Sequence, residues 1–531
     1  MKPSIPRKIV TFKEDSREKL MEGIEILANA VTTTLGPKGR NVGIQRQWGL
    51  PIVVHDGVTV AQEVMVDDEL AMIGVNLVRE AAKKTNEEAG DGTTTATLLA
   101  YEIAKRGKKL IDDGMNPMVL RAQIYKALPK LLEALKKSSK EVKGIEEISR
   151  VAFISSADEE IGRLVAEAIE KVGKDGLVTV DEGKGINTEV EYTEGMEFNK
   201  GWASPYFITN EQRMEGVIDE PIIAILDKKL SLGDESIPLY EAMAKISKDM
   251  VIIAHEISGD ALATLVGNKM KGNIKAIAIP APGVGENRRN YLDDIAVLTG
   301  GKVFEESSEV DLSNIKDWLG HAERVVSSRD TSVIINGRGS KEELEKRIEA
   351  LRVQKAEEKS EFEKEKIEER LAKLTTGVAV VRVGAKTEID MREKVERVKD
   401  AVGAASAARD EGVVPGGGVV FLKMRNALTE NNEGEQLLRE VLEAPVRKLL
   451  ANAGEDSTKI NEIVKKVSAD KGDLGYEVES GEVVSMTEKG IIDPAKVVRL
   501  ALENAIGVAT SILTTDCLIA IRYNYDNEKE N

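Results

Sequence analysis

Cysteine and histidine are nearly absent from this sequence. Its 531 residues contain one cysteine, Cys517, and three widely separated histidines. A lone cysteine excludes an internal disulfide framework and is typical of a protein in a reducing compartment. So few thiolate and imidazole ligands also make a zinc site of cysteines and histidines a poor interpretation.

Basic charge and long apolar runs are lacking as well. The net charge of −17 disfavours a nucleic-acid-binding protein, which needs a basic surface. No apolar run is long enough to cross a membrane, because the most apolar segment, 506–521, is interrupted by Thr514, Thr515 and Asp516. Residues 1–12 lack the apolar core of a signal peptide. We therefore expect a cytoplasmic protein.

Common phosphate-binding and catalytic motifs are also missing. The chain has no GxxxxGK[ST] sequence, so it is not a P-loop ATPase, and no GxGxxG opens a helix after a strand. No GxSxG nucleophile elbow is present either. A phosphate site in this protein would have to be assembled from turns that lie far apart in the sequence.

What the chain does contain is a composition rich in helix-forming residues, with 41% hydrophobic and 4% aromatic residues. A chain of this length is too long for one hydrophobic core, so we expect about two to four domains, mainly helical with some strands. The polar tail, residues 524–531, predicts disorder.

The hydrophobic pattern changes along the chain. Helical periodicity begins with a helix predicted over Asp15–Val31, where Asp15 and Glu18 resemble a capping box, and it dominates to about residue 137. Strand-like runs alternate with helical stretches over 195–335, which is typical of a separate α/β domain. Residues 340–374 predict a charged, solvated helical stretch, and the last hundred residues are helical again.

The segment Gly90-Asp91-Gly92-Thr93-Thr94-Thr95 carries the most chemical information. A glycine-rich turn followed by hydroxyls and an apolar helical pattern predicts a loop that enters a helix N-terminus, where free backbone N–H groups favour an anion. The carboxylate of Asp91 would repel a bare phosphate, so it fits a site in which Mg²⁺ lies between the two. The alternative is a capped structural helix after a polar turn, and these residues alone do not decide between the interpretations.

Other polar, glycine-containing turns are candidates for the rest of a phosphate site. They are Thr34-Leu35-Gly36-Pro37, Asp56-Gly57-Val58-Thr59, Gly416-Gly417-Gly418 and Ile491-Ile492-Asp493-Pro494. Asp56 and Asp91 are the candidate carboxylates on the metal side, because Mg²⁺ prefers oxygen ligands. Asp400 lies in a predicted helix and could orient a water toward the γ-phosphate. Taken alone, it is better interpreted as an exposed helix aspartate.

These pieces occur in the order found in a known family. From about residue 8 to residue 523 the sequence resembles a group I chaperonin of the GroEL type. The resemblance rests on TTTLGPKGRNV (32–42), DGVTVAQE (56–63), AGDGTTTATLLA (89–100), EGMEF (194–198), SPYF (204–207), ALATLV (261–266), LTGG (298–301), DEGVVPGGG (410–418) and IIDPAKV (491–497).

The resemblance implies a multidomain α/β fold that is mainly helical. An α-helical equatorial ATPase domain would comprise 1–137 and 411–531, the latter ending in the disordered tail. A small α/β intermediate domain would comprise 138–194 and 378–410, and an α/β apical polypeptide-binding domain would span 195–377. Gly195 and Gly377 are the implied hinges.

The resemblance also implies an activity. Subunits of this type form homo-oligomers of two stacked seven-membered rings, and their ATPase is coupled to protein folding, an isomerase-class reaction. Apical hydrophobic residues capture non-native polypeptides, and a cochaperonin of the GroES type then caps the cavity. ATP, Mg²⁺ and K⁺ are the implied cofactors, whereas nucleic acid and membrane are not implied partners.

The resemblance also implies which residues of this chain form its sites, position by position. Asp56 and Asp400 are the implied catalytic pair, and Asp400 reaches the nucleotide when the intermediate domain closes. Asp91 is implied to serve Mg²⁺, and Thr34 and Thr94 to help hold K⁺. The ATP-binding residues are Thr34, Leu35, Gly36, Pro37, His55, Asp91, Gly92, Thr93, Thr94, Thr95, Gly417, Glu477, Val478, Glu479 and Asp493. The polypeptide-binding residues are Trp202, Tyr206, Phe207, Ile237, Tyr240, Leu262 and Val266.

Several positions depart from the family pattern. His55 stands where the family usually has lysine, which predicts weaker or more pH-sensitive nucleotide binding. Glu477-Val478-Glu479 replaces Asn-Ala-Ala near the adenosine. Gly267 stands where the apical groove usually carries a bulky aliphatic residue, and Thr376 precedes Gly377 in place of a second glycine.

Two other functions stay open at this stage. One is a chaperonin-like holdase or scaffold ring with weak ATP hydrolysis, which the departures at His55 and Glu477 motivate. The other is a small-molecule kinase or ATPase that reuses the same site. A group II chaperonin is disfavoured, because no lid-like insertion interrupts the central region.

Overall fold

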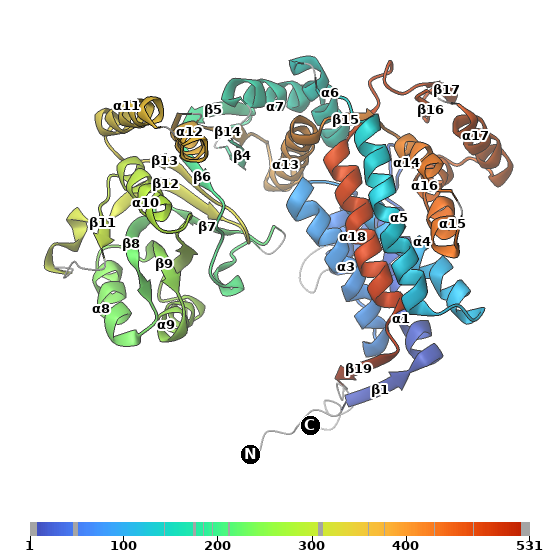
Figure 1. Ribbon diagram of the computed structural model, residues 1–531, viewed down its shortest axis with the longest axis horizontal. Coiled ribbons are helices and arrows are strands. Elements are labelled where there is room, and N and C mark those ends of the chain that lie inside the picture. The colour runs from blue at the N-terminus through green and yellow to red at the C-terminus, as the bar shows by residue number, and fades with distance from the viewer. Residues whose placement is uncertain are drawn as a thin grey trace. The chain divides into compact units, whose positions relative to one another are not determined.

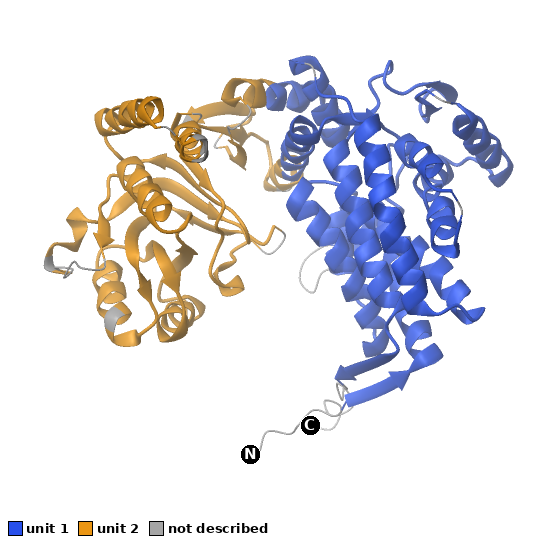
Figure 2. Ribbon diagram, in the orientation of Figure 1, with its two compact units in different colours: residues 1–166, 396–531 blue, residues 167–395 orange. Residues whose placement is uncertain are grey.

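The computed structural model describes residues 8–45, 51–142, 144–173, 177–183, 185–193, 195–210, 213–305, 312–358, 360–375, 377–429, 431–470 and 472–521. The predicted tail, 524–531, lies outside them. The chain divides into two compact units, the first made of 1–166 and 396–531 and the second of 167–395 (Figure 2). Within these ranges, no helix combines the length and apolarity that crossing a membrane requires.

The core of the first unit is a bundle of long helices (Figure 1). They are α1 (Lys13–Thr32), α3 (Glu69–Ala89), α4 (Thr93–Asp112), α5 (Pro117–Ser138) and α18 (Ala495–Leu513). Helix α18 packs against α3, α4 and α5, although it is far from them in sequence. The apolar stripe expected on α1 is fully buried, since Leu20, Ile24, Leu27 and Val31 have no exposed surface.

The start of α1 differs from the sequence prediction. The helix begins at Lys13, after Phe12, and no side chain caps it. The predicted capping box is therefore wrong, and Asp15 lies inside the first turn. The cause is tertiary: β1 (Lys8–Phe12) pairs with β19 (Cys517–Ile521), and the N–H of Lys13 donates to the carbonyl of Asp516 at 2.7 Å. Strand pairing thus sets where the helix can start.

Shorter elements surround the bundle. The helices are α2 (Gly57–Glu63), α6 (Ile145–Ser156), α14 (Val419–Met424), η3 (Arg425–Ala427), α15 (Glu433–Val441), α16 (Ala444–Asn452) and α17 (Ser457–Ala469). The strands form antiparallel pairs: β2 (Val42–Ile44) with β3 (Ile52–Val54), β15 (Val413–Pro415) with β18 (Ile492–Pro494), and β16 (Leu474–Glu477) with β17 (Glu482–Ser485). Helices α7 (Glu159–Val172) and α13 (Glu388–Glu411) carry the chain between the units.

The second unit is built on an eight-stranded sheet with the order β10-β9-β8-β12-β13-β6, and with β11 beside β8 and β7 beside β12. The strands β8 (Ile222–Leu230), β9 (Asp249–Ile257) and β10 (Lys275–Pro280) are parallel, as the alternating pattern predicted. Helices α8 (Gly233–Ala244) and α9 (Gly259–Met270) connect them. The other strands are β6 (Gly195–Phe198), β7 (Gly216–Asp219), β11 (Val303–Glu305), β12 (Gly320–Ser327) and β13 (Ser332–Gly337).

Helices cover this sheet, and a smaller sheet completes the unit. The helices are η1 (Pro205–Phe207), α10 (Glu286–Thr299), η2 (Leu312–Asp317), α11 (Lys341–Glu357) and α12 (Glu361–Thr375), so the charged stretch after 340 forms two helices. The buried pair of Arg370 and Asp294, at 2.6 Å, joins α12 to α10. The smaller sheet has the order β4 (Leu177–Glu182), β14 (Val378–Val383), β5 (Glu189–Thr193). The division into three domains stays a prediction.

Candidate functional site

The N-terminus of α4 has no side-chain cap. Gly90 ends α3 with a φ of 72°, and Gly92 precedes α4 with a φ of 93° and makes no capping bond. The first N–H groups of a helix have no acceptor within it, so those of Thr93, Thr94 and Thr95 are available to an anion. The hydroxyl of Thr93 is buried and has no hydrogen-bond partner among the described residues. These donors form a cradle for phosphate oxygens.

The first turn of α2 lies against this cradle. Asp56 caps α2, and its carboxylate accepts hydrogen bonds from Val58 N at 3.0 Å and Thr59 N at 2.7 Å. A Cβ at Gly57 would lie 2.3 Å from Thr94 Oγ1, so a larger residue there would displace the threonine. The predicted residues Asp56 and Thr94 are thus brought together by close packing.

Three carboxyl groups share one electrostatic environment. Loss of solvation around its carboxylate, followed by the negative charge of Asp56, raises the pKa of Asp91, although the residue as a whole is exposed. Burial and the charge of Asp91 raise the pKa of Asp493 to about 7. The pairing of β15 with β18 positions Asp493, and a Cβ at Gly416 would lie 3.0 Å from Asp493 Oδ1. Mutual repulsion of this kind is relieved by a cation.

The carboxylates do not by themselves form a metal cage. In the part of the chain that the structure describes, no group of three or more Asp, Glu, His or Cys side chains is arranged to hold a metal ion. Mg²⁺ is usually bound through one or two carboxylates plus phosphate oxygens and water. Asp91 beside an open phosphate cradle therefore fits Mg²⁺ in company with a nucleotide, and does not fit an all-protein metal site.

The turn at Thr34–Pro37 is held in place from α16. Asn452 donates from Nδ2 to the carbonyls of Thr32 at 2.9 Å and Leu35 at 3.0 Å. The buried Thr34 hydroxyl donates to Val31 O at 2.8 Å. Sequence reasoning missed Asn452, since a contact across more than 400 residues leaves no local signal.

This turn connects to the α4 cradle through packing. Val31 Cγ1 would lie 3.5 Å from a Cβ on Gly57, which in turn faces Thr94. A Cβ on Gly36, whose φ is 82°, would lie 2.2 Å from Leu449 Cδ2. Helix α1, which leads into this turn, therefore packs beside Gly57, and the turn itself packs against α16.

Gly417 and the β16–β17 hairpin meet at Met486. A Cβ at Gly417 would lie 2.7 Å from Met486 Cε, and one at Gly475 would lie 2.5 Å from Met486 Cγ. Sequence reasoning missed Met486, which is buried at 1% exposure. This contact places the hairpin that carries Glu477 beside Gly417.

The substituted segment 477–479 is occupied by local contacts. Ser480 Oγ donates to Glu477 at 2.7 Å, and Lys489 lies 3.5 Å from the same carboxylate. The Ser480 bond, followed by the charge of Lys489, lowers the pKa of Glu477. Val478 is half-buried and Glu479 is exposed.

Helix α13 rests on the Gly90 loop. A Cβ at Gly90 would lie 2.5 Å from the Cα of Gly403, so the two backbones touch. Asp400 precedes Gly403 by three residues and lies on the same face of α13. Sequence reasoning did not identify Gly403.

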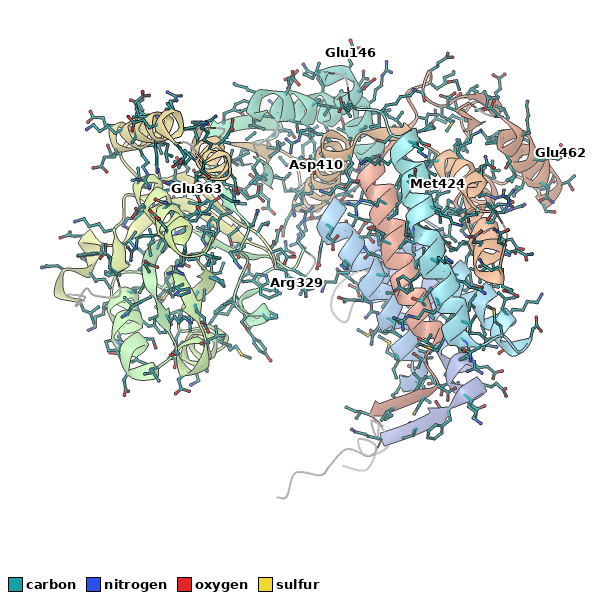
Figure 3. The ribbon with its side chains drawn as sticks, viewed as in Figure 1. Glu146, Arg329, Glu363, Asp410, Met424 and Glu462 are labelled. Carbon is teal, nitrogen blue, oxygen red and sulfur yellow. The ribbon has the colours of Figure 1, made fainter. Side chains whose placement is uncertain are left out.

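Two ion pairs fix the C-terminal end of α13 on α18. Asp410, labelled in Figure 3, accepts from Lys496 at 2.8 Å. Glu411 accepts from Arg499 Nε at 2.9 Å. These pairs anchor the part of α13 that follows Gly403, the residue in contact with Gly90.

His55 lies at the rim of this region. Its side chain is exposed, and its Nδ1 shares a hydrogen bond of 3.1 Å with Oδ1 of Asn41. This bond ties the end of β3 to the residue before β2. An effect of His55 on nucleotide affinity stays a prediction.

The residues expected to bind polypeptide fall into two groups. Tyr206 and Ile237 are 61% and 39% exposed, and Trp202, Leu262 and Val266 are partly buried. Phe207 and Tyr240 were expected to bind polypeptide, which requires exposure. They are instead 0% and 6% exposed and belong to the core of the second unit. Their side chains face the sheet from η1 and α8, and burial raises the pKa of Tyr240 to about 12.

The two predicted hinges differ. Gly377 has a φ of 66° between α12 and β14, a conformation that favours glycine. Gly195 lies in β6, and a Cβ there would lie 2.5 Å from Val378 Cγ2, so close packing explains this glycine. Rotation about either residue stays a prediction.

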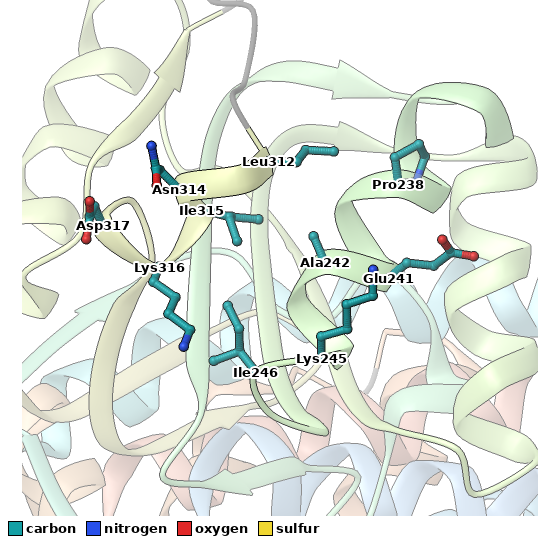
Figure 4. Close-up of a pocket in the computed structure, with 10 residues that line it drawn as sticks. All are labelled: Pro238, Glu241, Ala242, Lys245, Ile246, Leu312, Asn314, Ile315, Lys316 and Asp317. Atoms are coloured by element: carbon teal, nitrogen blue, oxygen red, sulfur yellow. The ribbon is translucent and has the colours of Figure 1, made fainter.

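Two grooves open on the second unit. One, of about 690 Å³, lies between α8 and α9 and includes Ile237. The other, of about 610 Å³, lies between α8 and η2, where Ala242 and Ile246 face Leu312 and Ile315 (Figure 4). The second groove contains none of the predicted polypeptide-binding residues.

Comparison with known proteins gives consistent results. The family model described as the TCP-1/cpn60 chaperonin family matches residues 27–522. Two crystal forms of the chaperonin gp146 from the bacteriophage EL 2 (Pseudomonas aeruginosa), both obtained in the presence of ATP-BeFx, are similar in fold. Form II has a TM-score of 0.68 at 20% identity and covers 97% of this chain and 100% of that chain. Form I has a TM-score of 0.62 at 20% identity, with 97% and 99% covered.

Proposed function

The chain belongs to the TCP-1/cpn60 chaperonin family, and we propose that it is an ATP-dependent chaperonin that captures non-native polypeptides on its second unit and folds them inside a ring. One observation carries the proposal. The uncapped N-terminus of α4, with the buried and unpaired Thr93 hydroxyl, directly follows Asp91 and packs against the turn that follows Asp56, and the charge of Asp91 acts on Asp493. Such a site suits a nucleotide that arrives with its cation.

The residues of the site have separate tasks in this proposal. The N–H groups of Thr93–Thr95 and the turn Thr34–Pro37 bind and orient the phosphates, and His55 lies beside them. Asp91 would hold Mg²⁺, which neutralises charge on the phosphates when bound. The Thr34 hydroxyl oxygen keeps its lone pairs free for K⁺, because it donates its hydrogen to Val31 O, and Thr94 would share that ion.

Asp56 and Asp400 are the proposed catalytic pair. Asp56 is held rigidly by two backbone N–H groups, which suits a carboxylate that orients a water for attack in line with the leaving phosphate. Asp400 approaches on α13, whose contact at Gly403 with Gly90 makes hydrolysis sensitive to the position of that helix. Gly417, Glu477–Glu479 and Asp493 would border the adenosine.

Ring assembly is the proposed oligomeric state, with seven-membered rings, two of them stacked, and a cochaperonin lid. Exposed apolar side chains on short edge strands support assembly. Phe12 in β1, Ile519 in β19 and Val53 in β3 are 61%, 58% and 68% exposed. Unpaired strand edges with apolar side chains are typical of surfaces that another chain covers.

ATP hydrolysis by the assembled protein tests the proposal. We expect Asp91→Asn to abolish Mg²⁺-dependent nucleotide binding, and we expect an unfolded protein to change the hydrolysis rate of the parent. Asp68→Asn, at the N-cap of α3, is a control, because it removes the charge of an aspartate that lies outside the site. Stimulation by a metabolite in place of unfolded protein would instead indicate a small-molecule kinase or ATPase.

A further inference from the structure

Thr85 is a buried polar residue that packs against the loop before α4. It lies near the end of α3 and is fully buried. Threonine is a poor helix former, and a buried hydroxyl needs hydrogen-bond partners to offset its lost hydration. The helix itself therefore gives no reason for a threonine at this position, and the contacts of the side chain supply one.

The Thr85 hydroxyl makes two hydrogen bonds, one of them to a helix far along the chain. It donates to the carbonyl of Ala81 at 2.9 Å. It accepts from Nδ2 of Asn504, in α18, at 3.0 Å. A threonine in a helix has more than one favourable rotamer. Two bonds from different sides fix the position of the oxygen, and with it the direction in which the methyl group points.

That methyl group packs against Gly92. A Cβ built on Gly92 would lie 3.1 Å from Thr85 Cγ2 and 2.8 Å from Val497 Cγ1, so these two side chains enclose one side of the turn. Gly92 has a φ of 93° and directly precedes the first residue of α4. A shift of Gly92 would therefore move the first N–H groups of α4, which form the proposed phosphate cradle.

The hydrogen bonds that Gly92 makes are local. Its N–H donates to the side chain of Asp91, and its carbonyl accepts from the N–H of Ala96 at 2.9 Å. Both partners belong to the same loop and helix, so they move together with the turn. Contacts with side chains of other elements therefore hold the turn against the rest of the unit, and Thr85 supplies one of these contacts.

We propose that Thr85, anchored by Asn504, is a positioning residue of the nucleotide site, and that its methyl group holds the Gly92 turn in the conformation in which the N–H groups of Thr93–Thr95 meet a phosphate. The inference rests on the proposed function and concerns the same site. Thr85 acts through Gly92 and takes no part in the chemistry. Without the methyl group, nucleotide binding has to impose an order on the turn that the parent already has before binding.

Removing the methyl group alone tests this role. Thr85→Ser keeps the hydroxyl, which can still make both of its bonds. We expect it to weaken binding of a fluorescent ATP analogue to the full-length assembled protein by about three- to tenfold, the range that one buried methyl group accounts for. The rate of hydrolysis at saturating ATP should change by about twofold or less, because the bound nucleotide restores the turn.

Removing the hydroxyl alone should give the opposite pattern. Thr85→Val keeps the shape of threonine and a methyl group against Gly92, but it leaves Nδ2 of Asn504 without its acceptor. We expect nucleotide affinity to stay within about twofold of the parent and the midpoint of thermal unfolding to fall by about 2–4 °C.

Thr510→Ser is the matched control. It removes a methyl group from a fully buried threonine of α18, whose hydroxyl donates to the carbonyl of Ile506 at 2.7 Å and faces Tyr125 of α5. It should leave nucleotide affinity unchanged.

The outcomes distinguish the inference from the proposed function. If Thr85→Ser binds nucleotide as tightly as the parent, the positioning role is wrong and the proposed ATPase stands. The same conclusion follows if Thr85→Ser and Thr85→Val lose affinity in proportion to their loss of thermal stability, since that pattern reports a general weakening of the fold. If the parent neither binds nor hydrolyses ATP, the proposed function itself is wrong, and the inference falls with it.

Discussion

At the scale of single residues, Asp493 is a titrating group of the proposed nucleotide site. Its pKa is raised to about 7 by burial and by Asp91, whereas an unfolded aspartate titrates near its ordinary value of 3.8. The folded state therefore holds this proton more tightly than the unfolded state. Stability is lost as the pH rises from about 4 through about 7, and the full penalty is present above that window.

The substitution Asp493→Asn removes this penalty. We expect it to raise the free energy of unfolding of the nucleotide-free protein at pH 8 by about 1–3 kcal/mol and to change it little at pH 4.5. Denaturant unfolding at the two pH values measures the effect. Glu479→Gln, at an exposed position of the same region, serves as control. Equal effects of Asp493→Asn at both pH values would contradict the raised pKa of Asp493.

His55 is the second residue with a distinct prediction. Histidine is only partly charged near neutral pH, whereas lysine carries a full charge. We expect His55→Lys to tighten nucleotide binding by about two- to fivefold, as is typical of one exposed charge, and to flatten its dependence on pH between 6 and 8. Titration of a fluorescent nucleotide at several pH values measures both. Identical affinity and pH profile in the two proteins would mean that His55 lies too far from the phosphates to matter.

At the scale of elements, we expect the contact between α13 and the α3–α4 loop to make ATP hydrolysis depend on the position of α13. Gly403 touches Gly90 backbone to backbone, and a Cβ at Gly403 would lie 2.6 Å from the Cα of Gly90. Alanine is more favourable than glycine inside a helix by about 1 kcal/mol, so helix propensity alone predicts that Gly403→Ala is harmless or stabilising. The clash of an added methyl group with Gly90 instead predicts that Gly403→Ala slows ATP hydrolysis.

We expect Gly403→Ala to lower the rate of ATP hydrolysis by about tenfold or more, because α13 and Asp400 must move away from the loop. Nucleotide affinity should fall much less, since the phosphate cradle is made by other elements. Steady-state hydrolysis and equilibrium binding give the two numbers. Gly507→Ala is the matched control inside α18, where there is space for the methyl group. A fully active Gly403→Ala protein would show that α13 is not coupled to the site.

Element identity was largely predictable, but contacts were not. The α/β region was predicted from strand-like runs that alternate with helical stretches over 195–335, and the parallel strands β8, β9 and β10 lie within it. The start of α1 was predicted wrongly, because the pairing of β1 with β19 overrides the local capping pattern. A sequence pattern reports local preference, whereas strand pairing between distant segments is decided by the whole fold.

Side-chain direction and long-range anchors were also beyond local reasoning. Phe207 and Tyr240 were expected at the surface, yet both pack into the core, because their direction depends on how η1 and α8 lie on the sheet. Asn452 and Met486 contact loops of the proposed nucleotide site from elements far along the chain. Neither residue belongs to a motif, so nothing in the sequence alone marks it.

At the scale of the whole molecule, the fold is that of a chaperonin, and the proposed nucleotide site and the grooves lie on different units. The first unit carries the predicted nucleotide residues, and the second carries the grooves and the exposed apolar residues. An activity that needs both units must couple ATP turnover to changes in client binding. This coupling separates a folding machine from a holdase or scaffold ring with weak hydrolysis.

The most direct measurement is the ATP-dependent refolding yield of an aggregation-prone client, with the parent beside Asp400→Ala, each with and without a cochaperonin. The account predicts that the parent with ATP restores the client. Asp400→Ala should bind the client and the nucleotide equally well and yet fail to cycle. If the parent holds the client and ATP changes nothing, the ATP-driven folding claim is contradicted, and the protein is a holdase or scaffold ring.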